Sequence, residues 1–313
     1  MNSFRATMIV GCTACGKGSL GRELARRTGG EIVSLDSMKI YRRMDIGTAK
    51  PSISDRRTIP HHLIDAAEPS EEFSVARYVE LSSRAIADIT RRGKPIFVVG
   101  GTILYLKALT EGLFEGPGAD ATVRARLHER AESEGSSGLH RELQIVDPGA
   151  AERIHPNDLK RIVRALEVYE LTGQPISALQ SQWNRNDAAD TFMILGLRRE
   201  KEDQSRRINQ RVHRMIEAGW VEEVQLLLDE PTPLSATARK ATGYGEIIEH
   251  LAGRMSLEEA VESTKITTRR FAKSQRTWLR RIRGIEWYEL SESDTDADIA
   301  DRLTADRGAT WSR

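Results

Sequence analysis

One segment limits the possible folds of this chain more than any other, Gly11-Cys12-Thr13-Ala14-Cys15-Gly16-Lys17. It matches the pattern Gly-x4-Gly-Lys, follows the apolar run Ala6–Val10, and opens the stretch Lys17–Arg27, in which leucines have helical spacing. In such a strand–loop–helix setting, backbone N–H groups, the helix N-terminus and the lysine ammonium form a site for phosphate. We therefore expect residues 11–19 to bind a phosphorylated ligand.

The residue after Lys17 departs from this pattern. Serine or threonine is usual there because its hydroxyl ligates Mg²⁺, but this chain has Gly18 and then Ser19. Three alternatives stay open: Ser19 substitutes from one position further on, water mediates the contact, or metal binding is weakened. Mg²⁺ is the expected cofactor, with Ser19 as its candidate protein ligand.

The only two cysteines, Cys12 and Cys15, lie inside the same loop. Two cysteines exclude a disulfide-rich secreted scaffold. The pair could be redox-active or half of a zinc site, with His61-His62 as an uncertain complement. We favour the simpler interpretation that small side chains fit a tight loop and that the histidines are structural.

The order of apolar and amphipathic segments predicts an α/β fold, a P-loop NTPase-like parallel sheet with a helical insertion. Residues 118–188 form the expected insertion, because helical periodicity runs from Ala121 to Leu179 and no convincing strand interrupts it. Residues 1–117 and 189–313 are the two parts of the core. The other expected strands are Glu31–Asp36, Pro95–Val99, Thr191–Leu197 and Gly284–Leu290, and a helix is expected over Ser74–Arg91.

Composition excludes several classes of protein. The 313 residues include 47 Lys and Arg against 46 Asp and Glu, so overall charge indicates no partner. No apolar run approaches the roughly 20 residues of a membrane span. We expect a soluble, cytoplasmic protein, monomeric by default, with an acidic and solvated segment at Ser291–Asp298.

Although the overall charge is near zero, one segment of the chain is strongly basic. Thr264 to Gly284 contains eight basic residues and no acid. One predicted helical face carries basic side chains, and a second stripe of Phe271, Gln275, Trp278 and Ile282 can pack, with Trp278 expected in the core. A one-sided basic helix favours nucleic-acid binding, although a solvated helix face is the alternative. The residues of the predicted basic face are Lys265, Arg269, Lys273, Arg276, Arg280 and Arg283.

Asp36 follows the second predicted strand directly. The carboxyl ends of parallel strands face the ligand crevice, so Asp36 is expected near the phosphate loop. It could ligate a metal, act as a general base, or cap a helix, and its position alone does not decide among these roles.

The motifs around Asp36 resemble those of the tRNA dimethylallyltransferases, also called tRNA isopentenyltransferases. The most specific block is Asp45-Ile46-Gly47-Thr48-Ala49-Lys50-Pro51, and the matching blocks run in the family's order from about residue 8 to residue 288. The other blocks are Asp36–Tyr41, Pro60–Asp65, Gly100-Gly101-Thr102-x-x-Tyr105, His155–Asp158, Arg161-x-x-Arg164-Ala165-Leu166-Glu167 and Thr268-Arg269-Arg270-x-Ala272-Lys273 with Gln275 and Thr277-Trp278.

This resemblance implies transfer of a dimethylallyl group from dimethylallyl diphosphate to N6 of adenosine 37, beside the tRNA anticodon. It implies that the loop, including Lys17, holds the diphosphate and that Asp36 is the base on N6. Thr102, Arg124 and Arg211 would be further active-site contacts. The residues implied to touch the tRNA anticodon loop are Asp36, Ser37, Met38, Lys39, Lys160, Arg161, Arg164, Lys240, Gly243, Tyr244, Lys273 and Arg276.

Four departures from the family pattern accompany the match: Gly18, Lys39 where glutamine is common, Ser274 where arginine is usual, and Gly245. Three alternative functions stay open. These are a prenyltransferase for free adenine nucleotides, a small-molecule P-loop kinase, and an RNA-binding protein without activity. The insertion and the basic segment disfavour the first, and Gly18 disfavours the second.

Overall fold

The structure, a computed structural model, describes residues 6–112, 116–180 and 192–311. The predicted strand start at Thr191 and the predicted boundary at residues 188–189 lie outside these ranges. The described chain falls into two compact units, one of residues 1–110 with 187–313 and one of residues 111–186. None of the helices in the described ranges combines the length and apolar character that crossing a bilayer requires.

Six parallel strands form the sheet of the first unit, in the order β3-β2-β4-β1-β5-β6. The parallel sheet and the strands expected from the sequence are confirmed, whereas the two-residue β3 was not predicted. Because β1, β2 and β4 are neighbours, the loops at their carboxyl ends meet at one edge of the sheet. The strands are β1 (Ala6–Gly11), β2 (Glu31–Leu35), β3 (His61–His62), β4 (Ile96–Gly100), β5 (Phe192–Arg199) and β6 (Ile285–Leu290).

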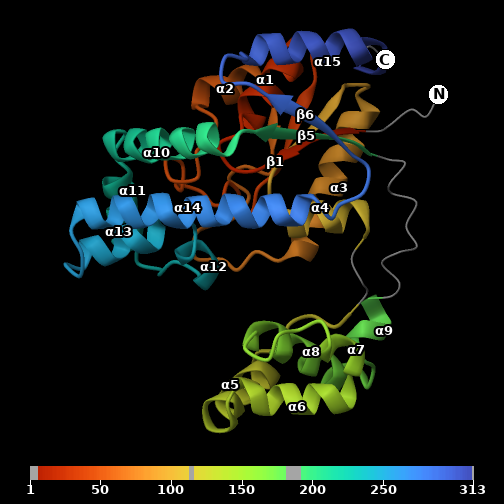
Figure 1. The fold of residues 1–313 in the computed structure, drawn as a ribbon, viewed down its shortest axis with the longest axis vertical. Helices are drawn as coiled ribbons and strands as arrows, with labels where there is room; N and C mark the ends of the chain where they lie inside the picture. Colours follow the sequence, from red (N-terminus) through yellow and green to blue (C-terminus); the bar gives the residue numbers. More distant parts are fainter. Residues whose placement is uncertain (1–5, 113–115, 181–191, 312–313) are drawn as a thin grey trace. The chain divides into compact units, whose positions relative to one another are not determined.

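Helices cover both faces of this sheet (Figure 1). Successive strand side chains point to opposite faces, so Met8 and Val10 pack with α3, α4 and α11–α14, while Ile9 packs with α1 and α15. The helices of this unit are α1 (Lys17–Thr28), α2 (Ile53–Thr58), α3 (Val75–Arg91), α4 (Ile103–Thr110), α10 (Lys201–Glu217), α11 (Trp220–Leu228), α12 (Ala236–Arg239), α13 (Tyr244–Leu251), α14 (Leu257–Leu279) and α15 (Asp296–Trp311).

The second unit is helical, as the periodicity predicts, and has a core of its own. Asp158 caps α8 by accepting a hydrogen bond from the N–H of Arg161, and Gly173 ends the helix with φ of 69°. Ile162, Val163 and Leu166 on α8 are buried in that core. The helices of this unit are α5 (Ala121–Glu134), α6 (Ser136–Val146), α7 (Pro148–Ala151), α8 (Leu159–Thr172) and α9 (Ile176–Gln180).

The C-terminal helix α15 was not predicted. Most of Ser291–Asp298 is exposed, as its acidic composition indicates, but the helix begins within it at Asp296. Ile299, Ala300 and Leu303 are buried in the cluster that α1 shares. Three apolar residues after an acidic run are too short a periodic signal to predict a helix, and only packing against α1 accounts for it.

Candidate active site

The phosphate loop joins β1 to α1 and is folded around its lysine. Ala14 and Gly16 have positive φ angles of 63° and 101°. The Lys17 ammonium donates to the carbonyl oxygen of Cys12 at 2.6 Å and lies 3.8 Å from the sulfur of Cys15. The charge of Lys17 therefore lies at the loop, at the N-terminus of α1, where an anion would bind.

Asp36 follows β2 in a fixed orientation. Its Oδ1 accepts hydrogen bonds from the backbone N–H groups of Met38 at 2.9 Å and Lys39 at 3.3 Å. The Oγ1 of Thr102, which follows β4, accepts from the N–H of Ser37 at 3.0 Å. These bonds tie together the ends of two neighbouring strands, so the Asp36 carboxylate is held by backbone geometry.

One cavity of about 1410 Å³ is lined by the phosphate loop, Asp36, Thr102 and Arg211. Ten of its lining residues are Lys or Arg and four are Asp or Glu, which suits an anionic ligand. Every lining residue belongs to the α/β unit. The larger apolar side chains among the lining residues are Met38, Ile46, Ile53, Val99, Ile208, Val212, Met215, Trp220 and Phe271.

Two positive side chains of the cavity are desolvated. Burial lowers the pKa of Lys39 to about 8; the Asp36 carboxylate opposes this shift, and the positive charges of Arg211 and Lys17 add to it. Burial also lowers the pKa of Arg211, against the attraction of Asp36. Arg211 reaches the loop from α10, where its Nη1 donates to the Thr13 hydroxyl at 3.3 Å. An entering anion would therefore meet cations poorly shielded by water.

The segment Asp45–Lys50 forms part of the cavity wall and is held from two sides. Glu223, on α11, accepts hydrogen bonds from three successive backbone N–H groups, those of Asp45, Ile46 and Gly47, at 2.7, 2.7 and 3.2 Å. A Cβ on Gly47 would lie 2.1 Å from the Trp220 indole nitrogen, so only glycine fits there. Glu223 was not predicted, because nothing in its own segment of the sequence marks a carboxylate that binds backbone 178 residues away.

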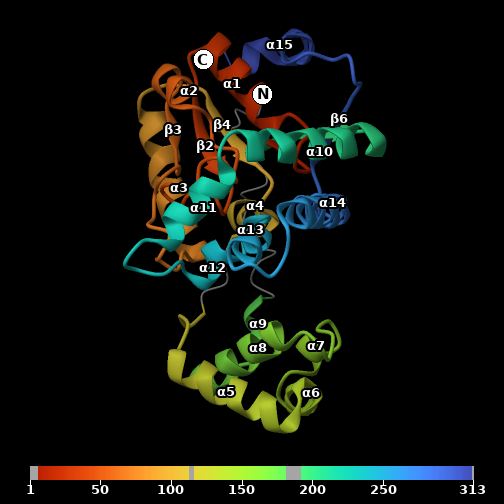
Figure 2. The same ribbon diagram turned by 90° about the vertical axis from the view of Figure 1, so that its left-hand side faces the viewer.

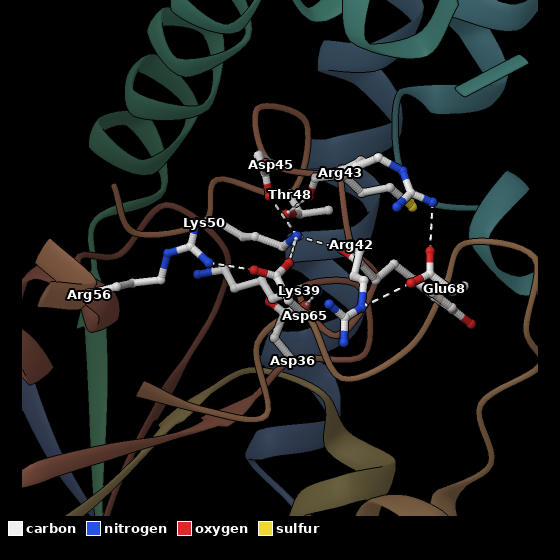
Figure 3. Close-up of polar contacts among 12 residues, drawn as sticks. Asp36, Lys39, Arg42, Arg43, Asp45, Thr48, Lys50, Arg56, Asp65 and Glu68 are labelled. Atoms are coloured by element: carbon white, nitrogen blue, oxygen red, sulfur yellow. Dashed lines mark hydrogen bonds and ion pairs between the residues drawn. The ribbon is translucent and has the colours of Figure 1, made fainter. Parts of the chain in front are cut away.

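On its other side, the same segment is held by Lys50. Its ammonium is buried and bonds to the carboxylates of Asp45 and Asp65, both at 2.6 Å, as Figure 3 shows. Arg56 also pairs with Asp65 (Figure 3), whose N–H donates to the carbonyl oxygen of Lys39 at 3.2 Å. The pairing of the buried Lys50 with Asp45 accounts for the spacing of these two residues in the block Asp45–Pro51.

Two residues predicted to contact RNA are buried. Gly243 packs against Trp220, and a Cβ there would lie 2.1 Å from the indole ring. Tyr244 is fully buried, and its hydroxyl donates to Glu223 at 2.7 Å. A direct contact between these two residues and RNA stays a prediction; in this structure both pack against Trp220 or Glu223, the residues that hold the cavity wall. Lys240 does line the cavity.

The basic segment around α14 is also organised differently from the prediction. Lys265 is buried and pairs with Glu262 at 2.6 Å, and α14 ends at Leu279, before Arg280 and Arg283. The aromatic residues Phe271 and Trp278 are 45% and 37% exposed, so the prediction of Trp278 in the core was wrong. Apart from Leu279, the buried residues of α14 are small or polar: Ala260, Thr264, Lys265, Ala272 and Gln275.

Four of the predicted residues lie in the helical unit. Arg124 donates to Glu167 at 2.8 and 3.0 Å, and Arg164 donates to the same buried carboxylate at 2.6 Å. Lys160 and Arg161 are exposed on α8. The predicted contacts of Arg124 with the reacting groups and of the other three with tRNA stay predictions.

The structure offers little protein ligation for a metal. Within the described ranges, no group of three or more His, Cys, Asp or Glu side chains could hold an ion. Cys12 and Cys15 are buried free thiols, and His62 bonds to Glu31 at 2.8 Å. The Ser19 hydroxyl donates to the carbonyl oxygen of Gly16 at 3.0 Å, which leaves its lone pairs available to a cation.

Taken together, a parallel sheet, a phosphate loop after β1 and a fixed carboxylate after β2 define a P-loop α/β enzyme that acts on a phosphorylated substrate. Comparison with known proteins narrows this class. The family model described as IPP transferase matches residues 39–282. A tRNA dimethylallyltransferase of Geobacter metallireducens is 51% identical over 285 residues, covering 91% of this chain and 92% of that protein.

Solved structures of similar proteins point to the same family. The tRNA isopentenylpyrophosphate transferase of Bacillus halodurans is 37% identical with a TM-score of 0.69, covering 97% of each chain. A eukaryotic dimethylallyltransferase acting on tRNA is 28% identical with a TM-score of 0.80, covering 97% of this chain and 79% of that one. The chain belongs to the tRNA dimethylallyltransferase family.

Proposed function

We propose that this enzyme transfers a dimethylallyl group from dimethylallyl diphosphate to N6 of adenosine 37 in tRNA. The observation that carries the proposal is the shared cavity, in which the phosphate loop and the Asp36 carboxylate line one space. A cavity with cations and apolar side chains suits a donor that has an anionic and a hydrocarbon end.

The diphosphate is the leaving group. As the bond between the allylic carbon and the diphosphate oxygen breaks, its electron pair goes to that oxygen, and charge develops there. Lys17, Arg211 and the N–H groups of the loop are arranged to stabilise this charge, and the desolvation of Arg211 strengthens its contribution.

Asp36 acts on the acceptor. The N6 lone pair of adenine is delocalised into the ring, so the amine is a weak nucleophile. As the new bond from N6 to the allylic carbon forms, the carboxylate accepts one N6 proton, an effect of about 10²–10⁴-fold for a well-placed base. The fixed orientation of Asp36 supports this role because the carboxylate needs little rearrangement.

Mg²⁺ fits this site as an ion held mainly by the substrate. Mg²⁺ usually keeps several waters and takes phosphate oxygens with only one or two protein ligands. Ser19 is the proposed protein ligand, since its hydroxyl proton is already donated to Gly16. When bound, the ion would neutralise charge on the diphosphate.

An adenine in a folded RNA loop must be turned out of its stack to enter such a cavity. This requires phosphate contacts away from the chemistry. We assign them to Lys240 at the cavity, the exposed Lys273 on α14, and Lys160, Arg161 and Arg164 of α8.

The test is incubation of the protein with Mg²⁺, dimethylallyl diphosphate and unmodified tRNA carrying A36-A37, followed by mass spectrometry of the nucleosides. N6-modified adenosine at position 37 is expected, and its absence would refute the proposal. Adding AMP as a competitor separates the alternatives, because preferential prenylation of AMP would identify a free-nucleotide enzyme.

A further inference from the structure

All three polar atoms of Thr13, in the phosphate loop, are held by residues more than 190 positions away in sequence. Its N–H donates to Oε1 of Gln275 at 2.8 Å, and its carbonyl oxygen accepts from Nε2 of Gln204 at 2.9 Å. Its hydroxyl accepts from Arg211. Gln204 and Arg211 belong to α10 and Gln275 to α14, two helices that lie side by side (Figures 1 and 2).

Gln275 links two parts of the active site. Its Oε1 binds Thr13, and its Nε2 donates to the carbonyl oxygen of Gly101 at 2.8 Å, just before Thr102. The side chain is buried, and a Cβ on Gly101 would lie 2.5 Å from its Nε2. Gln275 therefore fits one orientation only, joining the loop after β1 to the loop after β4.

Gln204 is oriented in the same manner. It is buried, and while its Nε2 binds the Thr13 carbonyl, its Oε1 accepts a hydrogen bond from Arg276, the neighbour of Gln275. Both glutamines thus have an acceptor and a donor engaged at once. An amide provides this without a net charge, whereas a carboxylate in the same place would repel a bound diphosphate.

The loop needs such support. Ala14, directly after Thr13, has φ of 63°, a left-handed conformation that a residue with a Cβ adopts at a cost. Conformations of this kind persist only where the surroundings hold them in place. The bonds to Thr13 hold the residue immediately before the strained one.

We propose that Gln275 and Gln204 are positioning residues that keep the loop in its diphosphate-binding conformation. They act through Thr13 and do not themselves touch the reacting atoms. The inference rests on the proposed function in one respect, that diphosphate is the group the loop binds.

The experiment measures the affinity of the full-length protein for inorganic diphosphate with Mg²⁺, by titration calorimetry, without tRNA or prenyl donor. Gln275→Ala and Gln204→Ala should each bind diphosphate about tenfold more weakly, the usual effect of one lost buried hydrogen bond and its unpaired partner. The double variant should lose less than the product of the two single losses, because both side chains hold the same residue.

Ser274→Ala is the matched control, an exposed neighbour on the same helix, and should bind diphosphate as the unchanged protein does. The tRNA affinity of Gln275→Ala, measured by filter binding, should stay within about twofold, since its lost bonds are to Thr13 and Gly101 and to none of the predicted tRNA contacts. If Gln275→Ala fails to fold, Gln204→Ala decides the question alone.

A folded variant with unchanged or tighter diphosphate binding would overturn the inference; tighter binding would mean that Gln275 blocks the Thr13 N–H. Losses that multiply fully would also overturn it, because the two glutamines would then act separately. Since this readout needs neither RNA nor transfer, its failure is distinct from failure of the proposed function, which the nucleoside analysis detects.

Discussion

At the scale of single residues, Asp36 gives the sharpest prediction. Asn in its place keeps an oxygen that can accept from the N–H groups of Met38 and Lys39, but it cannot accept a proton from N6. Asp36→Asn should therefore reduce the single-turnover rate of transfer by about 10²–10⁴-fold. Quench-flow measurement at saturating tRNA and donor would give this rate.

The affinity of Asp36→Asn for tRNA and its melting temperature should stay close to those of the unchanged protein. A parallel loss of rate and melting temperature would instead identify Asp36 as a structural residue of the turn after β2. Asp55→Asn is a suitable control, since Asp55 lies in the first turn of the exposed helix α2, where it accepts a hydrogen bond from the N–H of the N-cap residue Ser52.

The lowered pKa of Lys39 leads us to expect that the affinity for diphosphate depends on pH. Its pKa is lowered to about 8, so the ammonium is charged below that pH and loses its proton as the pH rises above it. A bound anion favours the charged form, and diphosphate affinity should therefore fall as the pH rises through 8. Titrations with diphosphate between about pH 6.5 and 9.5 would show this inflection.

Lys39→Gln should remove the inflection and bind diphosphate more weakly at neutral pH. It should approach the behaviour of the unchanged protein at high pH, where Lys39 is already neutral. The same inflection in the Gln variant would assign the pH dependence to another group.

At the scale of secondary-structure elements, the sequence predicted what is encoded locally. The phosphate loop between β1 and α1 has its own motif, and Asp36 and Thr102 follow apolar strands whose parallel pairing brings their ends together. Glu223, Gln204 and Gln275 could not be predicted in these roles, because each is an ordinary polar residue of a helix whose partner is decided by packing.

Helix α14 shows the same limit. Of the stripe that was predicted to pack, Gln275 is buried as expected, whereas Phe271 and Trp278 are exposed. Hydrophobicity favours burial of aromatic residues, but Gln275 and Ala272 allow the close approach to the phosphate loop that large rings would prevent. A specific polar contact therefore decided the orientation of the helix.

The exposed face of α14 carries a prediction of its own. Lys273 is exposed, so Lys273→Ala should remove one phosphate contact without disturbing the loop. When the logarithm of tRNA affinity is plotted against the logarithm of salt concentration, the slope should then be smaller in magnitude by about one. Arg84→Ala on α3 removes an exposed charge elsewhere and should leave the slope unchanged. An unchanged slope for Lys273→Ala would exclude this residue from the RNA interface.

At the scale of the whole molecule, the two units separate the predicted tasks. Every residue that lines the cavity belongs to the α/β unit, whereas Lys160, Arg161 and Arg164 belong to the helical unit. The helical unit has a separate core, in which Leu166 is buried. Disturbing that core should therefore affect RNA binding and leave diphosphate binding intact.

Leu166→Ala tests this division. The lost side chain should destabilise the helical unit by about 2–5 kcal/mol, measured by urea unfolding. Diphosphate affinity should stay within about twofold, while tRNA affinity falls because α8 no longer holds its basic residues in place. The reciprocal variant Leu20→Ala, in the α1 core, should weaken diphosphate binding. Equal loss of both affinities in Leu166→Ala would show that the helical unit supports the cavity as well, and the two tasks would not be separable.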